Sequence, residues 1–74
     1  MKLNEISVGD VGYVVEILGE KSITRRLLDI GFVPETKVEC VLQSLKKDIK
    51  AYKIRGTLIA IREEDASNII IFRK

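Results

Sequence analysis

Few side chains in this 74-residue sequence could carry out catalysis by themselves. The chain contains no histidine, the commonest general base in enzymes, and a single cysteine, Cys40. Cys40 alternates with Val38 and Leu42, a pattern that favours a buried thiol acting as a small apolar side chain over a reactive one. We therefore expect no catalytic residue and a protein that is not an enzyme.

Three successive carboxylates, Glu63, Glu64 and Asp65, are the candidate for a cation site. A regular element cannot aim three adjacent side chains at one ion, and the segment lacks the alternating spacing of a calcium loop. Acidic groups are favourable in the first turn of a helix, so we interpret residues 63–67 as a solvated helical turn. We expect neither a resident metal nor a cofactor, and a metal-sensing module that uses these carboxylates stays an alternative.

A basic segment, residues 46–55, could contact nucleic acid. Its lysines could neutralise phosphates, and Tyr52 could stack on a base. However, Asp48 interrupts the segment, Tyr52 is its one aromatic residue, and the net charge of the whole chain is only +2. We expect a solvated hairpin and no nucleic-acid partner, with a small nucleic-acid-binding barrel as the alternative, and we keep Tyr52 as a candidate partner-binding residue.

Arg25 and Arg26 are the candidates for docking onto a protein. Either arginine could form an ion pair with Asp29 within one helix, at a spacing of four or three residues. Leu28 and Phe32 are expected near the same flank, and arginine beside large apolar side chains is typical of interface hot spots. The candidate partner-binding residues are therefore Arg25, Arg26, Leu28, Phe32 and Tyr52, and a wet helix face remains the alternative reading.

The helix that carries the two arginines is predicted over residues 23–30. Ser22 is the expected N-cap, and Gly31 lies where a helix often ends in a left-handed residue. The helix has one apolar stripe at helical spacing. The stripe consists of Ile23, Leu27 and Ile30.

Strands are predicted on both sides of this helix. The first covers residues 10–18, and alternation places Val11, Tyr13, Val15 and Ile17 on one face. Four more are expected over residues 36–44, 49–55, 57–62 and 68–73. Several short strands can close into a barrel that hides their edges. We therefore predict a mainly β fold, a small β-barrel with one short helix inserted after the first strand, as a single domain over residues 1–74.

Cysteine content and hydropathy indicate the cellular compartment in which the protein is expected. A single cysteine excludes an internal disulfide, which agrees with a reducing environment. Charged residues interrupt the N-terminal segment, so it lacks the apolar core of a signal peptide. The apolar run at residues 69–72 is too short to cross a bilayer. We expect a cytoplasmic, soluble protein without direct membrane insertion.

Three segments, LNEISVGDVGYVVEILG, RRLLDIGFVPETKVEC and YKIRGTLIAIREEDASNIII, follow one another over nearly the whole chain. In this order and spacing they resemble the FeoA family, small cytoplasmic proteins of bacterial ferrous iron uptake. The residues that match the family pattern are Leu3, Gly9, Gly12, Arg26, Leu27, Gly31, Pro34, Arg55, Gly56, Arg62, Ala66 and Ile69.

The resemblance implies an SH3-like barrel and an accessory role. The implied partner is the cytoplasmic GTP-binding region of FeoB, the membrane transporter for ferrous iron, whose transport or nucleotide turnover the protein would modulate. The same barrel also resembles the C-terminal domain of metal-dependent transcriptional repressors, which supports the metal-sensing alternative. Where the family often has Pro-Gly, this chain has Pro34-Glu35, for which we expect a type I turn.

The last predicted strand has two apolar faces. Ile69 and Ile71 lie on one face, and Ile70 and Phe72 lie on the other. One face is expected to pack in the core, and the other needs cover from the partner or from another copy of the chain. Weak self-association therefore stays open.

Overall fold

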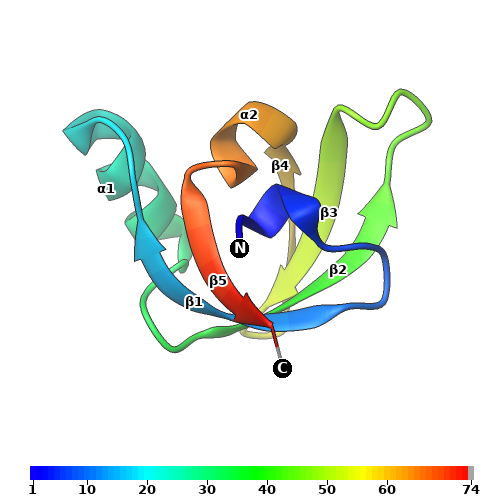
Figure 1. The fold of residues 1–74 in the computed structure, drawn as a ribbon, viewed down its shortest axis with the longest axis horizontal. Helices are drawn as coiled ribbons and strands as arrows, with labels where there is room; N and C mark the ends of the chain where they lie inside the picture. Colours follow the sequence, from blue (N-terminus) through cyan, green and yellow to red (C-terminus); the bar gives the residue numbers. More distant parts are fainter. Residues whose placement is uncertain (74) are drawn as a thin grey trace.

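Five antiparallel strands form one strongly curved sheet in the computed structural model, which describes residues 1–73 (Figure 1). The strands lie side by side in the order β4-β3-β2-β1-β5. The elements along the chain are η1 (Leu3–Glu5), β1 (Val11–Ile17), α1 (Lys21–Ile30), β2 (Lys37–Gln43), β3 (Ile49–Ile54), β4 (Thr57–Arg62), α2 (Glu63–Ala66) and β5 (Ile69–Arg73). The predicted mainly β fold with a helix after the first strand is confirmed.

The short helices occupy one end of the curved sheet. Figure 1 shows α2 and η1 at the mouth between the two halves of the sheet, with α1 to one side of the barrel. Apolar side chains from the strands and from all three helical elements fill the interior. The buried set is Leu3, Ile6, Val14, Leu27, Phe32, Val38, Cys40, Tyr52, Ile54, Ile61, Ala66, Ile69 and Ile71.

The alternation predicted for β1 breaks down along the strand. Gly12 and Val14 point into the core, whereas Val15 is exposed. Gly12 lets β5 approach closely, because a Cβ atom at this position would lie 2.8 Å from Cδ1 of Ile71. An irregularity in the β1–β5 pairing between Val14 and Glu16 then breaks the alternation along the strand.

A second irregularity in strand pairing changes which face the last apolar side chain of β2 occupies. Val38 and Cys40 are buried as predicted, but Leu42 is 57% exposed. The pairing of β2 with β3 shifts between Cys40 and Leu42, so that one extra residue enters β2 there. Because a shift of one residue exchanges the two faces of a strand, Leu42 turns outward.

The helix α1 begins two residues earlier than predicted, and Glu20 is its N-cap in place of Ser22. The predicted end at Gly31 is confirmed, with a left-handed φ of 131°. The Gly31 N–H donates to the carbonyl oxygens of Leu27 and Leu28, and the Phe32 N–H donates to that of Leu27. This glycine cap reverses the chain and drives Phe32 into the core.

The expected type I turn at Pro34-Glu35 is also wrong. Glu35 has a φ of 73°, and the Thr36 N–H donates to the Val33 carbonyl oxygen at 3.2 Å. Proline at the first central position and a positive φ at the second define a type II turn. Glutamate thus adopts the conformation that glycine normally supplies there.

Candidate partner-docking site

The outer face of α1 carries two of the predicted docking residues side by side. Arg25 and Leu28 lie one helical turn apart and line a shallow hollow of about 460 Å³. Leu28 is 37% exposed. The other lining residues are Gly19, Lys21, Thr24 and Asp29. This surface, which we call the α1 face, combines a cation with accessible apolar area.

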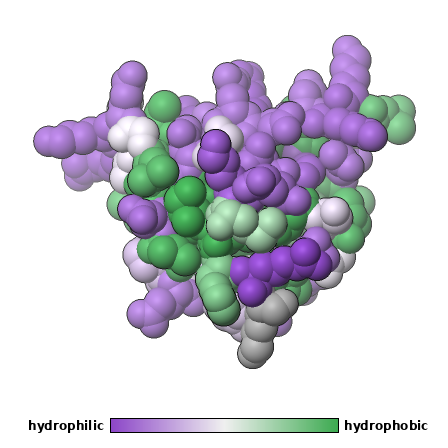
Figure 2. Space-filling model, in the orientation of Figure 1, coloured by the Kyte–Doolittle hydropathy of each residue, from purple (hydrophilic) through white to green (hydrophobic). Residues whose placement is uncertain are grey.

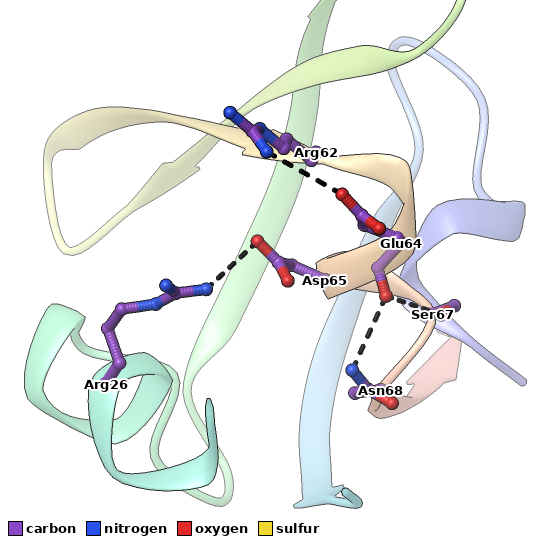
Figure 3. A network of polar contacts seen from close by, with 6 residues as sticks. All are labelled: Arg26, Arg62, Glu64, Asp65, Ser67 and Asn68. Carbon is purple, nitrogen blue, oxygen red and sulfur yellow. Dashed lines mark hydrogen bonds and ion pairs between the residues drawn. The ribbon is translucent and has the colours of Figure 1, made fainter. Parts of the chain in front are cut away.

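Arg26 points away from the α1 face, toward α2 (Figure 3). Its guanidinium contacts the carboxylate of Asp65 at 3.1 Å, across 39 positions of sequence. The ion-pair partner of Arg26 is therefore Asp65, and not Asp29 as expected. The side chains of Arg26 and Asp65 are 59% and 23% exposed, so the pair contributes at most about 1 kcal/mol to stability.

Two predicted docking residues are inaccessible, and the expectation that they face a partner is corrected. Phe32 and Tyr52 are both 0% exposed. Phe32 is drawn inward by the glycine cap of α1, and Tyr52 lies on the inner face of β3 opposite Cys40. The sequence pattern placed Phe32 beside Leu28 by extending helical spacing past Gly31, where the helix has already ended.

Sequence reasoning missed Lys21 and Thr24 as part of the α1 face. Lys21 lies four residues before Arg25, and Thr24 lies four residues before Leu28, so each is one helical turn from a docking residue. The correct helix start would have revealed Lys21, since the predicted helix began only at residue 23, whereas Thr24 already lay within the predicted helix. Asp65 carried no such signal, because its proximity to Arg26 depends on the path of the whole sheet.

The acidic turn and the cysteine lack the geometry of reactive sites. Glu64 lies 3.7 Å from Arg62 and Asp65 pairs with Arg26, so two of the three carboxylates face arginines (Figure 3). Within residues 1–73 no group of three metal-ligating side chains converges. Burial raises the pKa of the Cys40 thiol, which holds it in the neutral, unreactive form at pH 7.

The basic segment is partly committed to the fold. The Lys50 ammonium donates hydrogen bonds to the carbonyl oxygens of Asn4 and Ile6, at 2.8 and 2.7 Å. These bonds tie η1 to β3. With Tyr52 buried, the segment presents no aromatic surface for stacking on a base.

An apolar patch lies over β1 and β5. Phe72 is 66% exposed, and Met1, Val15 and Leu18 are also exposed. Figure 2 shows apolar surface on this side of the molecule. The two predicted faces of β5 are confirmed, because Ile69 and Ile71 are buried while Phe72 points outward. None of the helices in the described chain has the length and hydropathy needed to cross a bilayer.

Comparisons with known proteins agree on one family. The model of the FeoA domain matches residues 1–72. An Fe(2+) transport protein A/Fe(2+) transporter FeoB fusion protein of Porphyromonas gingivalis is 30% identical over 69 residues, which are 93% of this chain and 8% of that protein. The chain therefore corresponds to a small part of that relative.

Solved structures show the same fold. The solution structure of the FeoA protein from Chlorobium tepidum is 29% identical, has a TM-score of 0.91 and aligns with 99% of this chain and 70% of its own. The Stenotrophomonas maltophilia FeoA, described as a prokaryotic SH3 domain protein, is 23% identical, with a TM-score of 0.85 over 96% of this chain and 88% of its own. The curved sheet is thus an SH3-like barrel.

Proposed function

The chain belongs to the FeoA family, which is associated with ferrous iron transport, and we propose that it binds the cytoplasmic region of a FeoB-type membrane transporter. The fusion relative carries this proposal, because it joins an FeoA segment to a FeoB transporter in one polypeptide. Tethering raises the effective concentration of one part for the other, which is useful where the two parts act together.

The α1 face is the docking surface in this proposal. Leu28 supplies apolar contact, and Arg25 supplies charge-assisted hydrogen bonds to acidic groups on the transporter. Arginine with an adjacent apolar anchor is the combination that concentrates binding energy at interfaces. Arg26 is exposed enough to contribute once its contact with Asp65 is exchanged for one with the partner.

The role is that of a cytoplasmic accessory protein without chemistry of its own. Burial of Cys40 and the arginine contacts of Glu64 and Asp65 favour this reading over an enzyme or a metal-sensing module. Binding to the GTP-binding region would modulate transport by stabilising one of the states of that region.

Titration calorimetry of this protein against the soluble cytoplasmic domain of FeoB, with and without GTP, tests the proposal. Replacing Leu28 or Arg25 by alanine is expected to weaken binding about 30-fold, as is typical of a central interface residue. Lys46→Ala, in the exposed β2–β3 turn, is the matched control and should bind like the unchanged chain.

Arg26 needs a separate comparison because of its ion pair. Asp65→Asn removes the same ion pair but leaves the arginine in place. Arg26→Ala should therefore bind the FeoB domain more weakly than Asp65→Asn only if Arg26 itself contacts the partner. Equal affinities for Leu28→Ala, Arg25→Ala and the unchanged chain would remove the α1 face as the docking surface. Absence of binding in every nucleotide state would contradict the proposed partner.

A further inference from the structure

Strand β4 presents a free main-chain edge. It lies at one end of the sheet and, among residues 1–73, pairs with β3 alone. The β3–β4 turn has two residues, so Ile54 and Thr57 form a hydrogen-bonded pair and every second pair along the ladder does the same. Leu58 and Ala60 fall between these pairs. Their N–H and C=O groups therefore point away from β3, toward the open side of β4.

A groove of about 570 Å³ separates this edge from α1. Three consecutive residues of β4 line it: Ala60, Ile61 and Arg62. Successive side chains of a strand point to opposite faces, so three in a row line one groove only where the edge of the strand faces it. The outward amide and carbonyl of Ala60 thus open into the groove.

The side of the groove opposite β4 is mainly apolar. It is formed by Ile23, Leu27 and Ile30 of α1, together with Arg26, whose guanidinium pairs with Asp65. Ile30 is exposed and Ile23 is half-buried, so both offer accessible area to an occupant. This wall belongs to a different side of α1 from Leu28, which lines the other hollow.

The charged side chains that line the groove form ion pairs with one another. Arg26 pairs with Asp65 and Arg62 with Glu64, so the two cations and two anions of the lining neutralise one another (Figure 3). Neither an acidic nor a basic ligand is favoured by this balance. The main-chain edge and the apolar wall remain as the recognising features.

We propose that this groove binds an extended, uncharged polypeptide segment that adds to β4 as a further strand of the sheet. Only an extended main chain places alternate N–H and C=O groups at the spacing of Leu58 and Ala60. Side chains of the added segment that face α1 would be apolar, to pack on Ile23 and Ile30. The inference goes beyond docking through the α1 face and does not depend on which protein supplies the segment.

A defined peptide provides the probe. The blocked heptapeptide Ac-Thr-Val-Thr-Val-Thr-Val-Thr-NH2 is titrated into the ¹⁵N-labelled full chain, and amide hydrogen exchange is followed by NMR. Exchange at Leu58 and Ala60 is expected to slow at least tenfold at millimolar peptide. The same peptide N-methylated at every residue keeps the side chains but has lost its amide donors, and it should leave both rates unchanged.

Two variants of the protein locate the contact. Ala60→Pro removes the outward N–H, which an edge strand tolerates because that group takes no part in its ladder, and it should weaken peptide binding at least tenfold. Leu28→Ala, on the other side of α1, should bind the peptide normally. The N-methylated peptide keeps the test decisive even where Ala60→Pro fails to fold.

Unchanged exchange at Leu58 and Ala60 with millimolar peptide would overturn the proposal, as would equal protection by the N-methylated peptide. Protection that rises with protein concentration in the absence of peptide would identify a second copy of the chain as the occupant, and would also overturn it. These outcomes are separate from loss of FeoB binding in Leu28→Ala, which concerns only the α1 face.

Discussion

Glu35 stands in a backbone conformation that suits glycine. Its φ of 73° lies in the left-handed region, where a residue with a Cβ atom is strained by about 1–2 kcal/mol. Main-chain bonds hold it there, since the Glu35 N–H donates to the Val14 carbonyl oxygen at 2.7 Å. The strain at Glu35 is therefore imposed by the hydrogen bond that connects this turn to β1.

Glu35→Gly is expected to stabilise the protein by about 0.5–1 kcal/mol, because relief of the left-handed strain exceeds the added entropy of the unfolded chain. Urea unfolding checks this, as a higher midpoint at an unchanged slope. Glu39→Gly, in regular β2, is the control and should lower the midpoint. A lower midpoint for Glu35→Gly as well would show that its side chain makes a stabilising contact.

Tyr52 buries its hydroxyl without a hydrogen-bond partner among residues 1–73. An unpaired buried polar group costs about 1–3 kcal/mol, so Tyr52→Phe should leave stability at pH 7 unchanged or raise it. The variant keeps the ring that fills the core. A large loss of stability at pH 7 would mean that the hydroxyl is satisfied in solution.

The same residue predicts a pH dependence. Burial raises the pKa of Tyr52 far above its ordinary value of 10.0, so the folded chain keeps the proton that the unfolded chain loses. Its contribution to stability is therefore complete below pH 10 and is lost as the pH rises above that value. The free energy of unfolding should fall less steeply above pH 10 in Tyr52→Phe. Cys40 is present in both chains, so the difference reports the titration of Tyr52 together with its electrostatic interaction with Cys40.

At the scale of elements, the contact of β1 with β5 depends on the absence of a side chain at Gly12. A Cβ atom there would lie 2.8 Å from Cδ1 of Ile71 and 3.3 Å from the main-chain oxygen of Phe72. Gly12→Ala is thus expected to destabilise the protein by about 1–3 kcal/mol through overpacking. Thermal or urea unfolding measures the loss.

A double-mutant cycle tests the cause of that loss. Ile71→Val removes the Cδ1 atom and by itself costs about 0.5–1.5 kcal/mol. If the clash with this atom dominates, the double variant should lose less stability than the two single variants summed. Strict additivity would place the strain at the main-chain oxygen of Phe72 instead.

The helix α1 has different tasks on its different sides. Leu27 packs in the core, Arg26 contacts α2, and Leu28 with Arg25 forms the α1 face. The helix therefore joins the proposed docking surface to the groove beside β4.

At the scale of the molecule, the SH3-like barrel is a scaffold whose fold alone does not fix its ligand. The nucleic-acid alternative is disfavoured by the burial of Tyr52 and by the bonds of Lys50 to the N-terminal segment. We expect no change in the fluorescence anisotropy of a labelled single-stranded oligonucleotide at physiological salt. Binding that weakens steeply as salt rises, and that is lost in Lys46→Glu with Lys53→Glu, would contradict this expectation.

The sequence by itself determined the order of the five strands, α1 and α2, and several of their ends, but not η1. Gly31 ends α1 and Cys40 is buried, both as predicted, and the helical turn predicted over residues 63–67 covers residues 63–66. These features depend on neighbours within a few residues, through glycine backbone freedom, helix-terminus electrostatics and strand alternation. The family pattern depends on the same local features, which is why it could be recognised in the chain.

The tertiary structure alone decided which way particular side chains point. The bulges in β1 and β2 exposed Val15 and Leu42, because the register of a strand is set by the strand beside it. Arg26 met Asp65 in preference to Asp29, which lies on its own helix. The groove beside β4 also lies between segments distant in sequence, so local patterns carry no information about it.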